Sequence, residues 1–179
     1  MSASPGEIRR ARRVLFAHGL EGSPRGTKAR YLATLGAPLR VPDMRGLPLA
    51  ARVEILEREI AAGNVLLVGS SYGGLAAALV AQRHPDLLVG LVLCAPALCW
   101  AEPPNLDPAT LAAPVGLPVT VLHGLRDEVV PIAASRAYRD RSGPGVRLLE
   151  VDDDHALGGS LDLVGREILS LLAGSAGRR

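Results

Sequence analysis

Short apolar runs alternate along the chain with longer segments in which apolar residues recur every three or four positions. The short runs have the length of buried strands, and proline or glycine marks most of their ends. They are Val14–Ala17, Leu39–Val41, Val65–Val68, Val89–Cys94, Val119–Leu122 and Val146–Val151. The segments with helical spacing are Lys28–Leu35, Leu49–Ala62, Tyr72–His84, Ile132–Arg141 and Ser160–Leu172. Six strands that alternate with helices predict an α/β fold, in which helices cover both faces of a parallel sheet.

One stretch departs from this alternation. Residues 95–118 are rich in proline and alanine and contain at most a short helix, at Pro108–Ala112. We expect an irregular connection there, beside the functional site. A length of 179 residues suits one domain with a sizeable core, so a single domain over residues 1–179 is expected.

The composition is that of an ordinary folded protein, with 48% hydrophobic and 21% charged residues. The formal net charge is +2, and the basic cluster Arg9, Arg10, Arg12 and Arg13 has no interleaved aromatic residues. We therefore interpret this cluster as a solvated face and expect no nucleic-acid partner. No run approaches the roughly 20 apolar residues of a membrane span, and the N-terminal residues lack the pattern of a signal peptide. A cytoplasmic protein without membrane contact is expected.

Metal and cofactor chemistry find little support in the sequence. Cys94 and Cys99 lack Cys-x-x-Cys spacing, and we expect both to be buried free thiols. The four histidines are scattered, so no metal ligand set is predicted. A dinucleotide site is not indicated either, because G-x-G-x-x-G is absent. We expect no cofactor.

The clearest chemical signal is G-x-S-x-G at Gly69-Ser70-Ser71-Tyr72-Gly73, which follows the strand Val65–Val68 directly. The turn from strand to helix is so tight that side chains at the flanking positions would clash, hence glycine there. Ser71 is then exposed at the carboxyl end of the sheet as a candidate nucleophile. The Tyr72 N–H, at a helix N-terminus, can face a developing oxyanion. A chance match in a glycine-rich chain is the alternative, and the strand before and helix after disfavour it.

A serine hydroxyl needs a base, and imidazole suits that task near neutral pH. His84, His123 and His155 follow Ser71, and with this serine motif the chain order is nucleophile, acid, histidine. His84 closes a helix before Pro85, where a cation is favourable, so it is not a candidate base. His155 follows the last strand, at the same sheet edge as Ser71, and is the predicted base. His123 closes the strand Val119–Leu122 and is expected to be structural.

Asp127 lies in the loop after the fifth strand. A carboxylate there can bind the side of the His155 ring opposite the serine and fix its tautomer. Glu128 and Asp152 are the alternative acids. We interpret the run Asp152 to Asp154 as a solvated acidic loop whose field favours protonation of His155.

The first strand ends at His18-Gly19-Leu20-Glu21-Gly22-Ser23-Pro24. With this serine motif the second oxyanion donor comes from the loop after that strand, which points to the Leu20 N–H. Ser23 either caps this loop or contributes to the oxyanion hole. Gly19, Glu21 and Trp100 are the candidate walls of the substrate pocket.

These stretches, taken in order, resemble small bacterial esterases of the YqiA type, which belong to the α/β-hydrolase superfamily. The matching stretches are His18 to Pro24 with Lys28-Ala29, Gly69 to Gly74, Asp127-Glu128-Val129 and His155-Ala156. The resemblance spans nearly the whole chain and implies an esterase or thioesterase acting on short acyl esters. It implies Ser71, Asp127 and His155 at the triad positions, and little or no lid.

We therefore expect a minimal α/β-hydrolase with a mostly parallel six-stranded sheet, ordered 2-1-3-4-5-6, and its site near the first and third strands. The predicted reaction is hydrolysis of a small acyl ester by Ser71 through an acyl-enzyme. One alternative is a thioesterase, amidase or acyltransferase on the same scaffold. Another is a non-catalytic binding module that keeps the fold. The sequence leaves the oligomeric state open.

Overall fold

The computed structural model of the protein describes residues 12–101 and 106–174. Within them, six strands form one sheet in the order β2-β1-β3-β4-β5-β6, and every neighbouring pair is parallel. The strands are β1 (Arg13–Ala17), β2 (Leu39–Arg40), β3 (Val65–Ser70), β4 (Leu88–Cys94), β5 (Val119–Gly124) and β6 (Val146–Val151). The predicted sheet order is confirmed, and all of the pairing is parallel.

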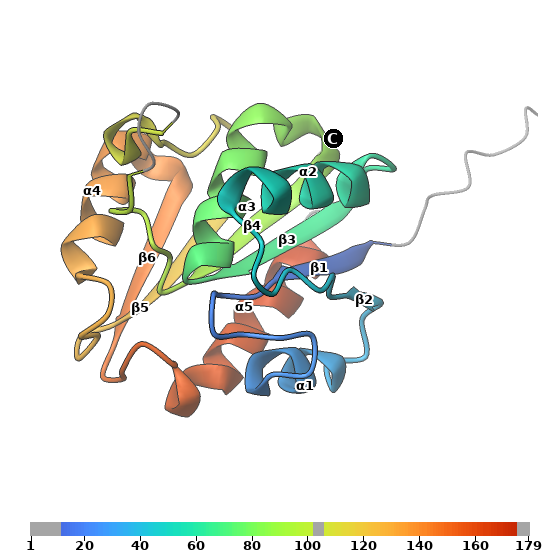
Figure 1. Ribbon diagram of the computed structural model, residues 1–179, viewed down its shortest axis with the longest axis horizontal. Coiled ribbons are helices and arrows are strands. Elements are labelled where there is room, and N and C mark those ends of the chain that lie inside the picture. Colours follow the sequence, from blue (N-terminus) through green and yellow to red (C-terminus); the bar gives the residue numbers. More distant parts are fainter. Residues whose placement is uncertain (1–11, 102–105, 175–179) are drawn as a thin grey trace, which may run out of the picture.

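In the described part of the chain, five α-helices cover the two faces of the sheet. They are α1 (Thr27–Ala33), α2 (Leu49–Ile60), α3 (Tyr72–Arg83), α4 (Ile132–Ser142) and α5 (Leu161–Gly174). Helices α1 and α5 pack on one face, the lower one in Figure 1, and α2 and α3 on the other. Tyr138 brings α4 into the same core cluster as α2 and α3. No helix in residues 12–101 and 106–174 is long and apolar enough to cross a membrane.

The strand order reverses between β1 and β3, because the chain first leaves β1 for β2 and then returns to the other side of β1. The loops that follow β1 and β3 therefore lead to helices on opposite faces of the sheet, and α/β proteins bind ligands at the carboxyl edge beside such a switch point. β3 is buried along its whole length, as its uninterrupted apolar run predicts. The candidate nucleophile follows this fully buried strand.

The connection from β4 to β5 is irregular, as expected. Its one described helical segment is a 3₁₀ turn at Pro108–Thr110, shorter than the predicted helix. Leu106 and Leu111 are buried against the core on the side of α2 and α3. In its described part the connection is therefore packed onto the domain rather than raised above it.

The two cysteines differ in environment. Cys94 ends β4 and is buried, and burial raises the pKa of its thiol to about 11. Cys99 is exposed, so the prediction of a buried thiol is wrong there. The reason is that the buried segment continues past β4 to Leu98, and the chain reaches the surface at Cys99.

Candidate active site

Ser71 forms a strained turn between β3 and α3. Its backbone has φ of 53° and ψ of −120°, a conformation that residues other than glycine rarely adopt. The Ser71 N–H donates to the Cys94 carbonyl at 3.0 Å, and the Ser71 carbonyl accepts from the Ala97 N–H at 3.0 Å. These bonds to the residues that end and follow β4 hold the serine in its strained state.

The glycines on either side are required by packing. A Cβ on Gly73 would lie 2.2 Å from the carbonyl oxygen of Ala17 and 2.5 Å from that of His18. A Cβ on Gly69 would lie 2.7 Å from the Cβ of Ala77. The turn is thus pressed against the end of β1, which brings the loop after β1 next to the serine.

Three of the predicted site residues meet in one hydrogen-bonded chain. His155 Nε2 lies 3.0 Å from Ser71 Oγ, and His155 Nδ1 lies 2.7 Å from Asp127 Oδ2. A carboxylate only accepts, so Nδ1 carries the proton and Nε2 accepts from the serine hydroxyl. This tautomer prepares the serine for proton removal.

Asp127 is anchored as an anion. Its side chain is fully buried, and its Oδ1 accepts from the amides of Val129 and Val130 at 2.8 Å each. Burial alone would raise the pKa of Asp127, but the hydrogen bonds from Val130, His155 and Val129 outweigh it and lower the pKa.

The two alternative acids lie elsewhere. Glu128 is exposed, and Asp152 pairs with Arg126 at 2.9 Å. In the described part of the chain, neither is bonded to His155. Of the three candidate acids, Asp127 is therefore the one that is bonded to His155.

The loop after β1 lies directly over the serine. A Cβ on Gly19 would lie 3.2 Å from the Cβ of Ser71. The Gly19 carbonyl accepts from the Gly22 N–H at 3.2 Å and bonds His18 Nδ1 at 2.8 Å. A trans peptide places its C=O and N–H on opposite sides, so fixing the Gly19 carbonyl also fixes the direction of the Leu20 N–H. The sequence indicates that His18 and Gly19 set this turn, and the bond from the His18 ring to the Gly19 carbonyl is how His18 contributes.

Comparison with known proteins shows which proteins share this fold. Residues 49–114, which include the serine turn, match the family model "Serine aminopeptidase, S33". A Xanthomonas campestris pv. campestris protein of the alpha/beta hydrolase superfamily is 27% identical, with a TM-score of 0.74, over 90% of this chain and 98% of that one. The chain has the fold of the α/β-hydrolase superfamily.

Other solved α/β-hydrolases share the fold at lower identity. Est1E from Butyrivibrio proteoclasticus, solved with ferulic acid, is 20% identical with a TM-score of 0.73, over 93% of this chain and 90% of that one. The Paleococcus ferrophilus monoacylglycerol lipase is 18% identical with a TM-score of 0.72, over 90% and 94%. A comparison with curated protein sequences gives no match.

A second histidine supports the acid. His123 is completely buried at the end of β5, and its Nε2 lies 2.9 Å from the Val130 carbonyl and 3.2 Å from Asp127 Oδ2. Two oxygens at Nε2 place the proton there, so Nδ1 accepts from the Ser135 hydroxyl at 2.7 Å. The predicted structural role of His123 thus includes holding Asp127. Its place four residues before the acid, at a strand end, is the signal that could have indicated this.

The acidic loop before His155 is only partly solvated. Asp153 is buried, and its carboxylate accepts from the Ser160 hydroxyl and the Asp154 N–H at 2.8 Å each. The expectation of a fully solvated loop is therefore wrong for Asp153, which acts as an internal cap of this turn. A Cβ on Gly124 would lie 2.4 Å from the Asp153 carbonyl oxygen, so the loops that carry acid and base touch.

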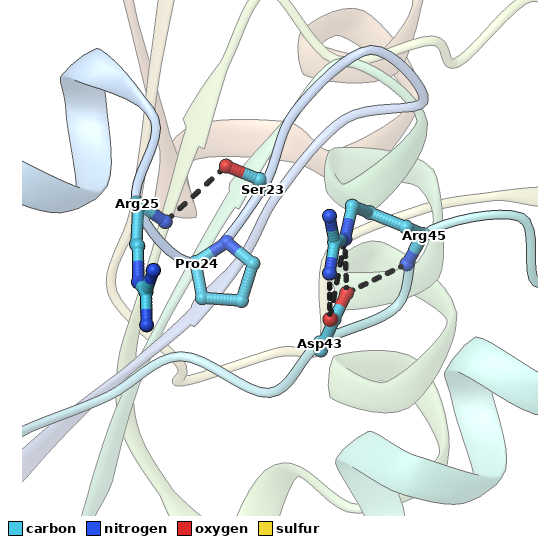
Figure 2. Close-up of a pocket in the computed structure, with 5 residues that line it drawn as sticks. All are labelled: Ser23, Pro24, Arg25, Asp43 and Arg45. Atoms are coloured by element: carbon cyan, nitrogen blue, oxygen red, sulfur yellow. Dashed lines mark hydrogen bonds and ion pairs between the residues drawn. The ribbon is translucent and has the colours of Figure 1, made fainter.

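A hollow of about 280 Å³ lies between the loop after β1 and the loop after β2. It is lined by Ser23, Pro24, Arg25, Asp43 and Arg45. Figure 2 shows the two arginines on opposite sides of Pro24, with Arg45 bound to Asp43. This pairing holds the pKa of Asp43 at about 2. Ser23 Oγ accepts from the Arg25 N–H at 3.2 Å, which is turn capping, the first of the two roles predicted for Ser23.

The predicted pocket residues lie outside this hollow. Trp100 is 47% exposed, and its ring packs at a tilt on Tyr72 with centroids 5.5 Å apart. Leu20 is 42% exposed on the loop over the serine, and Glu21 is exposed beside it. Tyr72 directly follows the serine, so Trp100 flanks the candidate site as an apolar surface.

His18 leads to a prediction about acid stability. The Met44 N–H donates to His18 Nε2 at 3.0 Å, and this bond requires neutral imidazole. Burial, with a contribution from nearby Arg52, lowers the pKa of His18 below 6.5, while the bond to Gly19 opposes the shift. The unfolded chain then binds more protons as the pH falls below 6.5, so the free energy of unfolding decreases through that window. Urea unfolding at pH 7.5 and 5.5 should show this decrease, and His18→Gln should reduce the difference between the two pH values. An unchanged difference in His18→Gln would assign the pH dependence to other groups.

Proposed function

We propose that the protein is a serine hydrolase that cleaves short acyl esters. Ser71 acts as nucleophile, His155 as general base and Asp127 as the acid that orients the base. The observation that carries the proposal is the unbroken chain of hydrogen bonds from Ser71 through His155 to Asp127, at a strained strand-to-helix turn.

The reaction follows from this arrangement. Ser71 Oγ attacks the ester carbonyl while its proton passes to His155 Nε2, and Asp127 stabilises the imidazolium. The amides of Tyr72 and Leu20 bind the resulting oxyanion. The tetrahedral intermediate collapses, the alcohol leaves with the proton from His155, and water then hydrolyses the acyl-enzyme by the same steps. These residues need neither a metal nor an organic cofactor for this sequence.

A small ester is the favoured substrate. Leu20 and Trp100 offer apolar contact on either side of the serine turn, and the described part of the connection after β4 adds only one 3₁₀ turn near it. Among the proteins with this fold, Est1E was solved with ferulic acid, and another is a monoacylglycerol lipase. The resemblance to YqiA-type esterases supports the same class. An esterase of short acyl chains is therefore proposed, with a small molecule as partner.

Amide hydrolysis is a second candidate, because the family model that matches residues 49–114 is named for a serine aminopeptidase. A comparison of p-nitrophenyl butyrate with alanine p-nitroanilide separates the two. The esterase proposal expects turnover of the ester only.

Labelling with a fluorophosphonate tests the proposed nucleophile directly. Intact mass should show one adduct on the wild type and none on Ser71→Ala or His155→Ala. Ser70→Ala is the matched control, because Ser70 is the neighbouring serine and is buried at the end of β3, and its variant should keep the adduct. A folded wild type without an adduct would contradict the proposal and favour a non-catalytic binding module.

A further inference from the structure

Arg52 in α2 is a charged residue in the core. Its side chain is completely buried. Nε donates to the Leu47 carbonyl at 2.9 Å, and Nη1 donates to the His18 carbonyl at 2.8 Å. Nη2 has no hydrogen-bond partner in the described part of the chain, and Arg52 is in none of the ion pairs found there.

This arrangement is unfavourable for stability alone. Burying a charge is expensive unless a counter-charge and full hydrogen bonding compensate for it, and apolar residues of similar size often replace buried ions without loss. Among the described residues, the contacts of the guanidinium are to two carbonyl oxygens and to the Tyr72 ring, whose centroid is 5.0 Å from Cζ. Burial lowers the pKa of Arg52, and Tyr72 partly opposes that shift.

The contacts of Arg52 join the two segments that carry the proposed oxyanion donors. The His18 carbonyl, held by Nη1, belongs to the loop that presents the Leu20 N–H. The Tyr72 ring, under the guanidinium, belongs to the residue that supplies the other N–H. The same His18 oxygen lies against Gly73, since a Cβ there would approach it to 2.5 Å. Arg52 therefore touches both sides of the contact between the loop after β1, here called the oxyanion loop, and the serine turn.

We propose that Arg52 is a positioning residue that holds the two halves of the oxyanion hole in register and adds an uncompensated positive charge beneath them. The inference rests on the proposed hydrolase function. A transition state with a full negative charge on oxygen benefits from such a charge more than the neutral ester does, because the surrounding core screens it poorly. Replacement of Arg52 is then expected to lower kcat and the affinity for an oxyanion mimic, while ground-state binding of the ester stays unchanged.

The test compares Arg52→Met and Arg52→Lys with the wild type, using p-nitrophenyl butyrate and a short-chain trifluoromethyl ketone. The ketone forms a tetrahedral adduct with an oxyanion. Arg52→Met should lower kcat about 30-fold and should lower the affinity for the ketone by a similar factor. KM should change less than about threefold. Arg52→Lys keeps the positive charge but cannot bond the two carbonyls at the same time, as the guanidinium does. A decrease of about tenfold in kcat and in ketone affinity is expected. Active-site titration and circular dichroism restrict each comparison to folded protein.

Arg141→Met is the matched control. Arg141 also bonds two backbone carbonyls, of Leu111 and Pro108, but contacts neither oxyanion segment, so kcat and ketone affinity should stay at wild-type values. Wild-type values in folded Arg52→Met would overturn the proposal. If Arg52→Met does not fold, wild-type values in Arg52→Lys would overturn it instead. Failure of the proposed function is distinguishable, because the wild type itself would then neither label with a fluorophosphonate nor hydrolyse the ester, and the inference would fall with it.

Discussion

Asp127→Asn is expected to lower kcat by about 10⁴-fold while the protein stays folded. An asparagine oxygen can still accept from the Val129 and Val130 amides that now bond Asp127 Oδ1. Its NH₂ group would then face His155 Nδ1 and donate to it, which moves the imidazole proton to Nε2. A protonated Nε2 cannot accept from Ser71, and no carboxylate remains to stabilise the imidazolium. The loss arises from the wrong tautomer rather than from a displaced residue.

Steady-state hydrolysis of p-nitrophenyl butyrate measures this loss, with thermal unfolding to confirm that the fold is retained. Asp140→Asn is a suitable control, because Asp140 is an exposed aspartate that pairs with Arg139 on α4. It should keep wild-type kcat. If Asp127→Asn kept kcat within tenfold of the wild type, another group would have to orient His155, and the assignment of Asp127 would be wrong.

The arrangement of the sheet could be predicted because parallel strands buried on both faces appear as uninterrupted apolar runs. β6 was predicted with its observed bounds, and β3 and β5 with their observed starts. The same logic brought Ser71, Asp127 and His155 together, since each follows the carboxyl end of a strand in one parallel sheet. Chain order and strand ends carried that prediction, and neither needs knowledge of side-chain contacts.

The supporting contacts could not be predicted in this way, because they join residues that are distant in sequence. His18 holds Gly19 only because Met44, in a later loop, donates to its other nitrogen. Arg52 carried a signal that was missed. The buried residues of α2 are Leu49, Arg52, Val53, Leu56 and Ile60, so helical spacing puts this arginine on the apolar face. A charge at such a position indicates a specific partner, here the His18 carbonyl.

Gly73→Ala is expected to have the largest effect on stability together with a loss of activity. The added methyl would lie 2.2 Å from the Ala17 carbonyl oxygen and 2.5 Å from the His18 carbonyl oxygen. Both are backbone atoms at the end of β1, and the Arg52 bond holds the second in place, so neither can move cheaply. The clash of the added methyl can be relieved only if the serine turn and the oxyanion loop move apart. We expect the free energy of unfolding to fall by about 3 kcal/mol or more, at or above the upper end of the usual cost of core overpacking.

Activity distinguishes this mechanism from simple destabilisation. Separation of the two segments misaligns the Leu20 and Tyr72 amides, so the fraction of Gly73→Ala that remains folded should still turn over ester at least 100-fold more slowly than wild type. Urea unfolding gives the stability, and kcat normalised to folded protein gives the second quantity. Gly174→Ala is the control, because a Cβ there meets no atom within 4 Å. A Gly73→Ala protein that unfolds like the wild type would mean that the turn can move away from β1. Full activity per folded molecule would mean that the contact between the two loops does not set the geometry of the oxyanion hole.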